Sequence, residues 1–225
     1  MPIPRKRTSR KPPPSVHDFL ELEPPAGGKR PRAGDLLGED LEPGEWTPVS
    51  GMVFGCMTVC FFYMVYLLAG SNAITGESFV LMMLHSVNLV FHEFGHPAFS
   101  FFGDTMGILG GTLGQILIPL VVAVAFWKKR DSAGFFFGAF WFFENFLDVA
   151  VYMADAIDLK LQLIGGLGME AHDWRNLFLR WDCILQAKTI AGITAGIGWV
   201  GMFWAWLWLG WRCLMTRNKR LSKIS

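Results

Sequence analysis

The order of apolar and polar residues divides the chain into a polar N-terminal segment and a series of long apolar runs. Residues 1–46 are rich in proline, glycine and charge, a composition that cannot bury enough surface to fold on its own. From residue 51 onward, apolar runs recur with lengths near 20 residues, which is what a helix needs to cross a bilayer. The pattern predicts a disordered N-terminal tail followed by an all-α membrane bundle of about five transmembrane helices.

The apolar runs set the boundaries of the predicted spans. These spans cover residues 51–69, 78–102, 107–127, 134–153 and 189–211. Residues 155–187 are mixed and polar, and we expect them to form a long connection with short helices at the membrane interface. The predicted membrane-embedded domain is therefore 47–212, and residues 213–225 form a basic C-terminal tail.

Composition strengthens the membrane interpretation. Of the 225 residues, 52% are hydrophobic and only 17% are charged, whereas soluble domains carry about 25% charged residues. The formal net charge of +1 gives no indication of a nucleic-acid partner, and none is expected. We predict a multi-pass integral protein of the cell (cytoplasmic) membrane, with the lipid bilayer as its main surroundings.

The second predicted span contains the motif His92-Glu93-Phe94-Gly95-His96. On a helix, side chains four positions apart share a face, so both imidazoles can reach one metal ion. The carboxylate of Glu93 can then act as a general base on a metal-bound water. Ionisable groups at bilayer depth cost several kcal/mol. A bound Zn²⁺ offsets this cost more directly than the alternative, in which the histidines only form hydrogen bonds between helices.

A catalytic zinc usually has three protein ligands and one open position, so a third ligand is needed. Asp148 is the expected ligand because it lies deepest among the acids of the fourth predicted span. His172 or Asp173 would take its place if the connection after that span folds back over the bundle. Three more residues are alternative ligands or supporting residues: His85, Glu144 and Asp155.

The start of the third predicted span is rich in glycine. Gly110 and Gly114 form a G-x-x-x-G pair, which lets another backbone approach closely. We expect this entry, through Gly110 and Gly111, to bind an unwound peptide strand. Gln115 would then hydrogen-bond the backbone of that strand, and Asn145 would orient the substrate or the neighbouring carboxylate.

Across about residues 78–155, these motifs resemble the site-2 protease family of intramembrane zinc metalloproteases. The resemblance implies zinc held by His92, His96 and Asp148, with Glu93 activating water. It also implies that the substrates are transmembrane or membrane-associated proteins. Around Asp148 the chain has neither the proline nor the glycine that accompany the aspartate of that family.

The residues leave three other functions open. The same metal and base would serve a hydrolase of lipid amides or esters. Histidines and acids on facing helices could pass metal ions through a transporter, and a structural metal could stabilise a non-catalytic membrane protein. Replacement of Glu93 by glutamine should abolish hydrolysis but leave ion flux or a structural metal intact. The product, cleaved peptide or released fatty acid, separates the two hydrolases.

Overall fold

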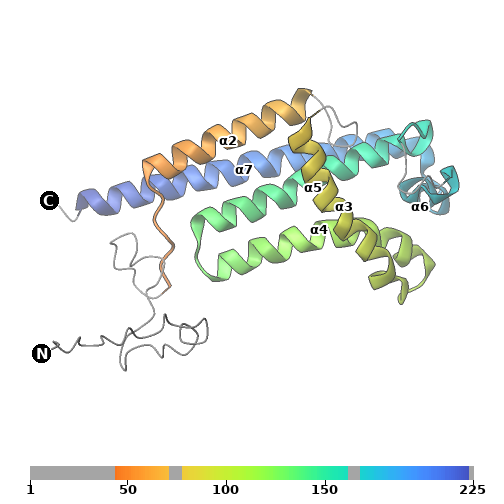
Figure 1. Ribbon diagram of the computed structural model, residues 1–225, viewed down its shortest axis with the longest axis horizontal. Helices are drawn as coiled ribbons and strands as arrows, with labels where there is room; N and C mark the ends of the chain where they lie inside the picture. Colours follow the sequence, from red (N-terminus) through yellow and green to blue (C-terminus); the bar gives the residue numbers. More distant parts are fainter. Residues whose placement is uncertain (1–43, 71–77, 162–167, 223–225) are drawn as a thin grey trace, which may run out of the picture. The chain divides into compact units, whose positions relative to one another are not determined.

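The computed structural model describes residues 44–70, 78–161 and 168–222 (Figure 1). Throughout these residues the chain is helical or irregular, with no strand. The predicted all-α fold is therefore confirmed, whereas the tail predicted over 1–46 falls almost entirely outside the described residues. The helices are α2 (Gly51–Gly70), α3 (Phe79–Ser100), α4 (Asp104–Lys128), α5 (Ser132–Asp158), η3 (Met169–Ala171), α6 (Asp173–Arg180), η4 (Ile184–Gln186) and α7 (Ala187–Ser222).

Four helical segments of the described chain are long and apolar enough to cross a membrane. They are α2, α4, α5 and Ile184–Ser222, which includes α7. The fifth long helix, α3, has 22 residues, but its three histidines, its asparagine and its glutamate make it less apolar. A bundle of about five long helices is thus confirmed, and α3 is the long helix that carries the histidine motif.

The last helix is longer than the sequence pattern predicts. The apolar run ends near residue 211, but α7 continues to Ser222, so residues 213–222 extend the helix. The reason is that the arginine, lysine and leucine residues beyond the apolar run are all good helix formers.

Helix α5 packs along α7 on one side and against α4 on another, while α3 packs against α4 and α2 contacts α7 (Figure 1). Aromatic side chains fill much of the α5–α7 contact, and the rings of Phe135 and Trp208 lie 4.6 Å apart. On the α7 side, the buried residues Met202, Ala205 and Leu209 belong to the same apolar cluster. Helix α4 therefore packs against both α5 and the motif helix.

Glycines bring α3 and α4 into backbone contact. A Cβ atom added at Gly95 would collide with the carbonyl oxygen of Gly110, and one added at Gly110 would lie 2.5 Å from the Gly95 carbonyl oxygen. A Cβ at Gly114 would meet the carbonyl oxygen of Phe91. The close approach expected at the G-x-x-x-G pair is therefore confirmed, and its partner is the glycine inside the histidine motif.

The connection after α5 folds back over the bundle. Helix α5 ends where the Asp155 carboxylate accepts the backbone N–H groups of Lys160 and Leu161, at 2.8 and 3.0 Å. Helix α6 then packs its buried face against α5 through one apolar cluster that includes Trp174, Phe178 and Met153. This docking places the first residue of α6, Asp173, beside the motif helix.

Candidate metal centre

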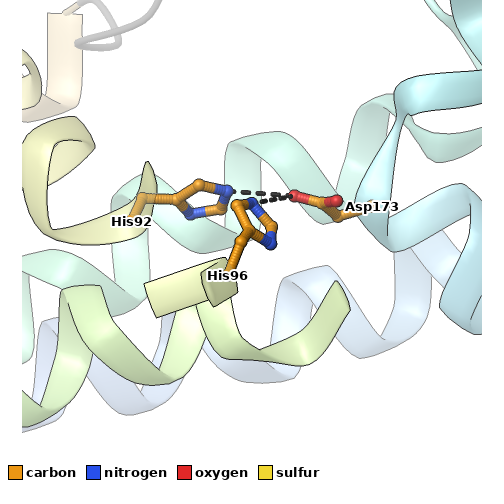
Figure 2. A group of neighbouring side chains, drawn as sticks. All are labelled: His92, His96 and Asp173. Atoms are coloured by element: carbon orange, nitrogen blue, oxygen red, sulfur yellow. Dashed lines mark hydrogen bonds and ion pairs between the residues drawn. The ribbon is translucent and has the colours of Figure 1, made fainter. Parts of the chain in front are cut away.

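The candidate metal centre lies where α3 faces the start of α6 (Figure 2). The Nε2 atom of His92 is 3.0 Å from Oδ2 of Asp173, and Nε2 of His96 is 3.4 Å from the same oxygen. The ligand atoms of the three residues all lie within 4.8 Å of one another. This group could hold a metal ion, with the two histidines supplied by the i, i+4 spacing of the motif.

The Nδ1 atoms of both histidines face oxygen atoms that accept hydrogen bonds. Nδ1 of His92 lies 3.2 Å from Oε1 of Gln115, and Nδ1 of His96 lies 2.9 Å from the carbonyl oxygen of Gly107. Each Nδ1 therefore carries the hydrogen, and each Nε2 of a neutral ring directs a lone pair at Asp173. A cation between the rings and the carboxylate, either a proton on Nε2 or a metal ion, removes the repulsion between these lone pairs and the Asp173 oxygen.

Two of the three distances between ligand atoms are compatible with a tetrahedral metal. Zinc binds histidine nitrogen at about 2.0–2.1 Å, so donor atoms around a tetrahedral zinc lie about 3.3 Å apart. The two distances from His92 and His96 to Asp173, 3.0 and 3.4 Å, lie on either side of that value. The hydrogen bonds at Nδ1 also match the outer partners that orient metal-binding histidines in proteins.

Asp173 is held as an anion. Burial acts to raise the pKa of the Asp173 carboxyl, but its interactions with His92 and His96 outweigh burial, and the pKa lies below its usual value. The backbone N–H of Asp173 donates to the hydroxyl oxygen of Tyr152 at 3.0 Å, which ties the start of α6 to α5. The third member of the group is thus charged and positioned before any metal binds.

Gly111 of α4 lies directly against the ligand nitrogens. A Cβ atom at this position would be 2.6 Å from Nε2 of His92 and 2.7 Å from Nε2 of His96. Only glycine, which has no Cβ atom, lets α4 approach the two nitrogens this closely. Of the two glycines predicted to bind a substrate strand, Gly111 therefore lies at the metal group, and Gly110 lies in the α3–α4 contact.

Glu93 follows His92 on α3, and its side chain is exposed. Its charge acts on both His96 and Tyr152, which places the carboxylate in the electrostatic surroundings of the metal group. The only acid of the motif is therefore close to the ligands but is not one of them.

The structure brings Asp173, and not Asp148, to the two histidines. The carboxylate of Asp148 accepts from Nδ1 of His85 at 2.9 and 3.0 Å, from Asn88 at 3.3 Å and from Gln115 at 2.8 Å. These three donors hold it away from His92 and His96. Depth within the span favoured Asp148, but the nearest acid comes from the connection that folds back.

Two neighbouring residues of α5 join the Asp148 cluster. Glu144 is fully buried, and its Oε2 accepts from Nδ2 of Asn88 at 3.2 Å. Asn145 is also fully buried and donates to the carbonyl oxygen of Trp141 at 2.9 Å. The structure therefore places neither residue within the metal group, and it buries Asn145, which was expected to orient the substrate or the neighbouring carboxylate.

His172, at the start of α6, and Asp155, near the end of α5, form a pair separate from the metal group. His172 caps α6 by accepting the N–H of Arg175 at Nδ1, and its Nε2 lies 3.6 Å from Asp155. Burial lowers the pKa of His172, and this outweighs the carboxylates of Asp155 and Asp173, which act to raise it. A neutral His172 therefore shapes the start of α6 and does not join His92 and His96.

Tyr152 had no assigned role in the sequence analysis. Its hydroxyl accepts from the Asp173 backbone, its ring lies 4.3 Å from that of His172, and its ring lies 6.0 Å from that of His92. The available signal was its place on α5 one turn after Asp148, on the polar side of an otherwise apolar helix. The residue links the motif helix, α5 and α6 at a single position.

Comparison of the chain with family models, with curated proteins and with solved structures finds no match to any of them. The chemistry of this site is therefore interpreted from its own geometry.

Proposed function

We propose that the protein is a membrane-embedded zinc hydrolase that cleaves peptide bonds of membrane-associated proteins, as the site-2 protease-like motif suggests. The observation that supports it is the convergence of His92 Nε2, His96 Nε2 and Asp173 Oδ2 beside Glu93. Catalytic zinc sites typically use three protein ligands, whereas structural sites are closed by four. Among the described residues, the group has three members.

Two imidazoles and one carboxylate are ligands that suit Zn²⁺. When bound, zinc supplies a Lewis acid and lowers the pKa of a coordinated water toward 7. The chain provides the remaining groups. Glu93 takes the proton of the attacking water and passes it to the leaving amine.

Other contacts keep the ligands in place for this chemistry. The Tyr152 hydroxyl holds the Asp173 backbone, and the Gly107 carbonyl holds the His96 ring. Gly111 lets α4 lie close to both ligand nitrogens. A helical substrate has to unwind before its peptide bond can reach the metal group, because helical carbonyls are already hydrogen-bonded.

The test combines metal content with product analysis. Wild-type and Glu93→Gln proteins are purified in detergent, and zinc per chain is measured by mass spectrometry. The same variants are produced in a bacterial host, and new N-termini among its membrane proteins are identified by proteomics. We expect equal zinc in both proteins, but new N-termini only with the wild type. Glu170→Gln, which changes an exposed acid in η3, serves as the matched control and should behave like the wild type.

Each alternative function has its own outcome. Retained cleavage in Glu93→Gln would remove Glu93 from the mechanism. Release of fatty acid in place of new N-termini would assign a lipid hydrolase, and metal flux into liposomes that survives Glu93→Gln would assign a transporter. A wild-type protein without zinc would overturn the proposal.

A further inference from the structure

We propose that Asp148 is a positioning residue for the metal centre, which orients the Gln115 amide so that His92 presents its Nε2 atom to the metal. This inference rests on the metal binding of the proposed function, but not on peptide cleavage. It gives a role to the buried Asp148 carboxylate, which is not a ligand but is joined to the ligand His92 by two hydrogen bonds through Gln115.

The first step is that the Asp148 carboxylate is surrounded by donors. His85 reaches both of its oxygens through Nδ1, and Asn88 and Gln115 donate through their amide nitrogens. The orientation of Asn88 has an independent cause, since its Oδ1 accepts from the indole N–H of Trp141 at 2.8 Å and indole can only donate. The amide nitrogen of Asn88 must therefore face the carboxylates.

The second step concerns the two ends of the Gln115 amide. Its Nε2 lies 2.8 Å from Oδ2 of Asp148, and its Oε1 lies 3.2 Å from Nδ1 of His92. The reversed amide would direct an oxygen at the Asp148 carboxylate, and two acceptors cannot form a hydrogen bond. Gln115 is buried, so exchange of this contact for solvent is costly. Asp148 therefore decides which end of the amide meets His92.

The third step transfers this orientation to the metal. An oxygen at Nδ1 requires the hydrogen of the His92 ring to be on that atom, which leaves the lone pair on Nε2, where Asp173 lies. His96 receives the same constraint from the backbone carbonyl of Gly107, which cannot be reversed. Of the two histidine ligands, only His92 depends on a side chain, and that side chain depends on Asp148.

The donor and acceptor pattern suggests an exchange experiment. Asp148→Asn removes the carboxylate that orients Gln115, and Gln115→Glu places a second carboxylate against Asp148. In the Gln115→Glu, Asp148→Asn double variant, the carboxylate at position 115 accepts from His92 and the amide at position 148 donates to that carboxylate. Side-chain size and total charge are unchanged in the double variant, and the path from position 148 through position 115 to His92 is restored with the two groups exchanged. The amide oxygen at position 148 can still accept from His85, and the Asn88 amide keeps Glu144 as its acceptor.

Glu144→Gln is the matched control. This substitution also replaces a buried carboxyl group of α5 by an amide, and Glu144 contacts the same Asn88 amide, but no described hydrogen bond joins Glu144 to Gln115. A general effect of losing a buried carboxyl group in α5 would appear in this control as well. An effect transmitted through Gln115 would not.

Zinc affinity of the full-length protein in detergent is measured by competition with a chromophoric chelator. We expect each single variant to bind zinc about 10- to 100-fold more weakly, the range found for outer partners of metal ligands. The double variant and Glu144→Gln should remain within about 3-fold of the wild type, well below that range. The d–d absorption of bound Co²⁺ should keep a tetrahedral form wherever metal binds.

A double variant that binds no better than the single variants would overturn the proposal. So would a loss in Glu144→Gln equal to that in Asp148→Asn, since both results assign Asp148 a general structural role. If the single variants fail to fold, rescue of folding and zinc binding together in the double variant still supports the coupling. Wild-type protein that binds zinc but cleaves nothing would contradict the proposed function alone, whereas wild-type protein without zinc would overturn both.

Discussion

His92 and Asp173 are separated by 81 positions in the sequence, yet Nε2 of one lies 3.0 Å from Oδ2 of the other. The contact joins the motif helix to the first residue of α6. It forms because the apolar face of α6 docks on α5 and carries Asp173 back over the bundle. The metal group is therefore a product of tertiary folding and not of the motif alone.

The first prediction concerns this carboxylate. Asp173→Ala should weaken zinc binding by more than about 100-fold, beyond the range found for outer partners, because it removes a direct ligand. Zinc content after dialysis and chelator competition measure the effect. Glu170→Ala, an exposed acid three positions earlier, should bind zinc as the wild type does. Equal zinc binding in both variants would show that Asp173 is not a ligand.

The second prediction concerns Gly111, which lies against the ligand nitrogens. Gly111→Ala should yield a folded protein that binds little zinc, since its methyl group would occupy the position 2.6–2.7 Å from both Nε2 atoms. Gly192→Ala in α7 is the control, because a Cβ atom there meets nothing within 4 Å. Normal zinc content in Gly111→Ala would contradict the proposed position of the metal.

The third prediction concerns the contact between α3 and α4. Gly95→Ala should lower the free energy of unfolding by about 1–3 kcal/mol or more, the cost of overpacking a close contact. The added Cβ would collide with the Gly110 carbonyl. Unfolding of the detergent-solubilised protein measures the change. Gly196→Ala, where a Cβ meets nothing within 4 Å, should not be destabilised, and similar stability of both variants would argue against the backbone contact.

The fourth prediction concerns pH. Metal binding requires imidazoles that carry no proton on Nε2, and protons compete with the metal for these atoms, so zinc affinity should fall as pH decreases. Asp173 does not contribute to this fall, because its pKa lies below the usual aspartate value and it stays ionised throughout. Titration of zinc affinity from about pH 8 to 5.5 measures the slope, which should approach two protons per metal at the acidic end. A flat profile would exclude His92 and His96 as ligands.

The sequence predicts the long helices well because apolar length determines them. The expected spans 51–69 and 107–127 correspond to helices at Gly51–Gly70 and Asp104–Lys128. The motif helix and its glycine contact also follow from local spacing. Such features depend on residues that are close in the chain or on a repeated small-residue pattern.

The third member of the metal group could not be chosen from the same signals. Asp148 and Asp173 were both named as possible ligands, and depth in the membrane favoured the first. Depth does not determine which acids are already satisfied by donors. Asp148 meets three donors, whereas Asp173 reaches the histidines only because the connection after α5 folds back. Both facts depend on contacts between distant segments.

The backbone contact at Gly95 and Gly110 also limits how the site can move. A slide of α3 along α4 by a single residue, about 1.5 Å, would drive the carbonyl of one helix into the backbone of the other helix. We therefore expect α3 and α4 to move as one rigid block, which carries the two histidines, the Gly107 carbonyl and Gln115. Any motion that separates the three ligands has to come from the α6 side, where a short helix carries the only ligand outside that block.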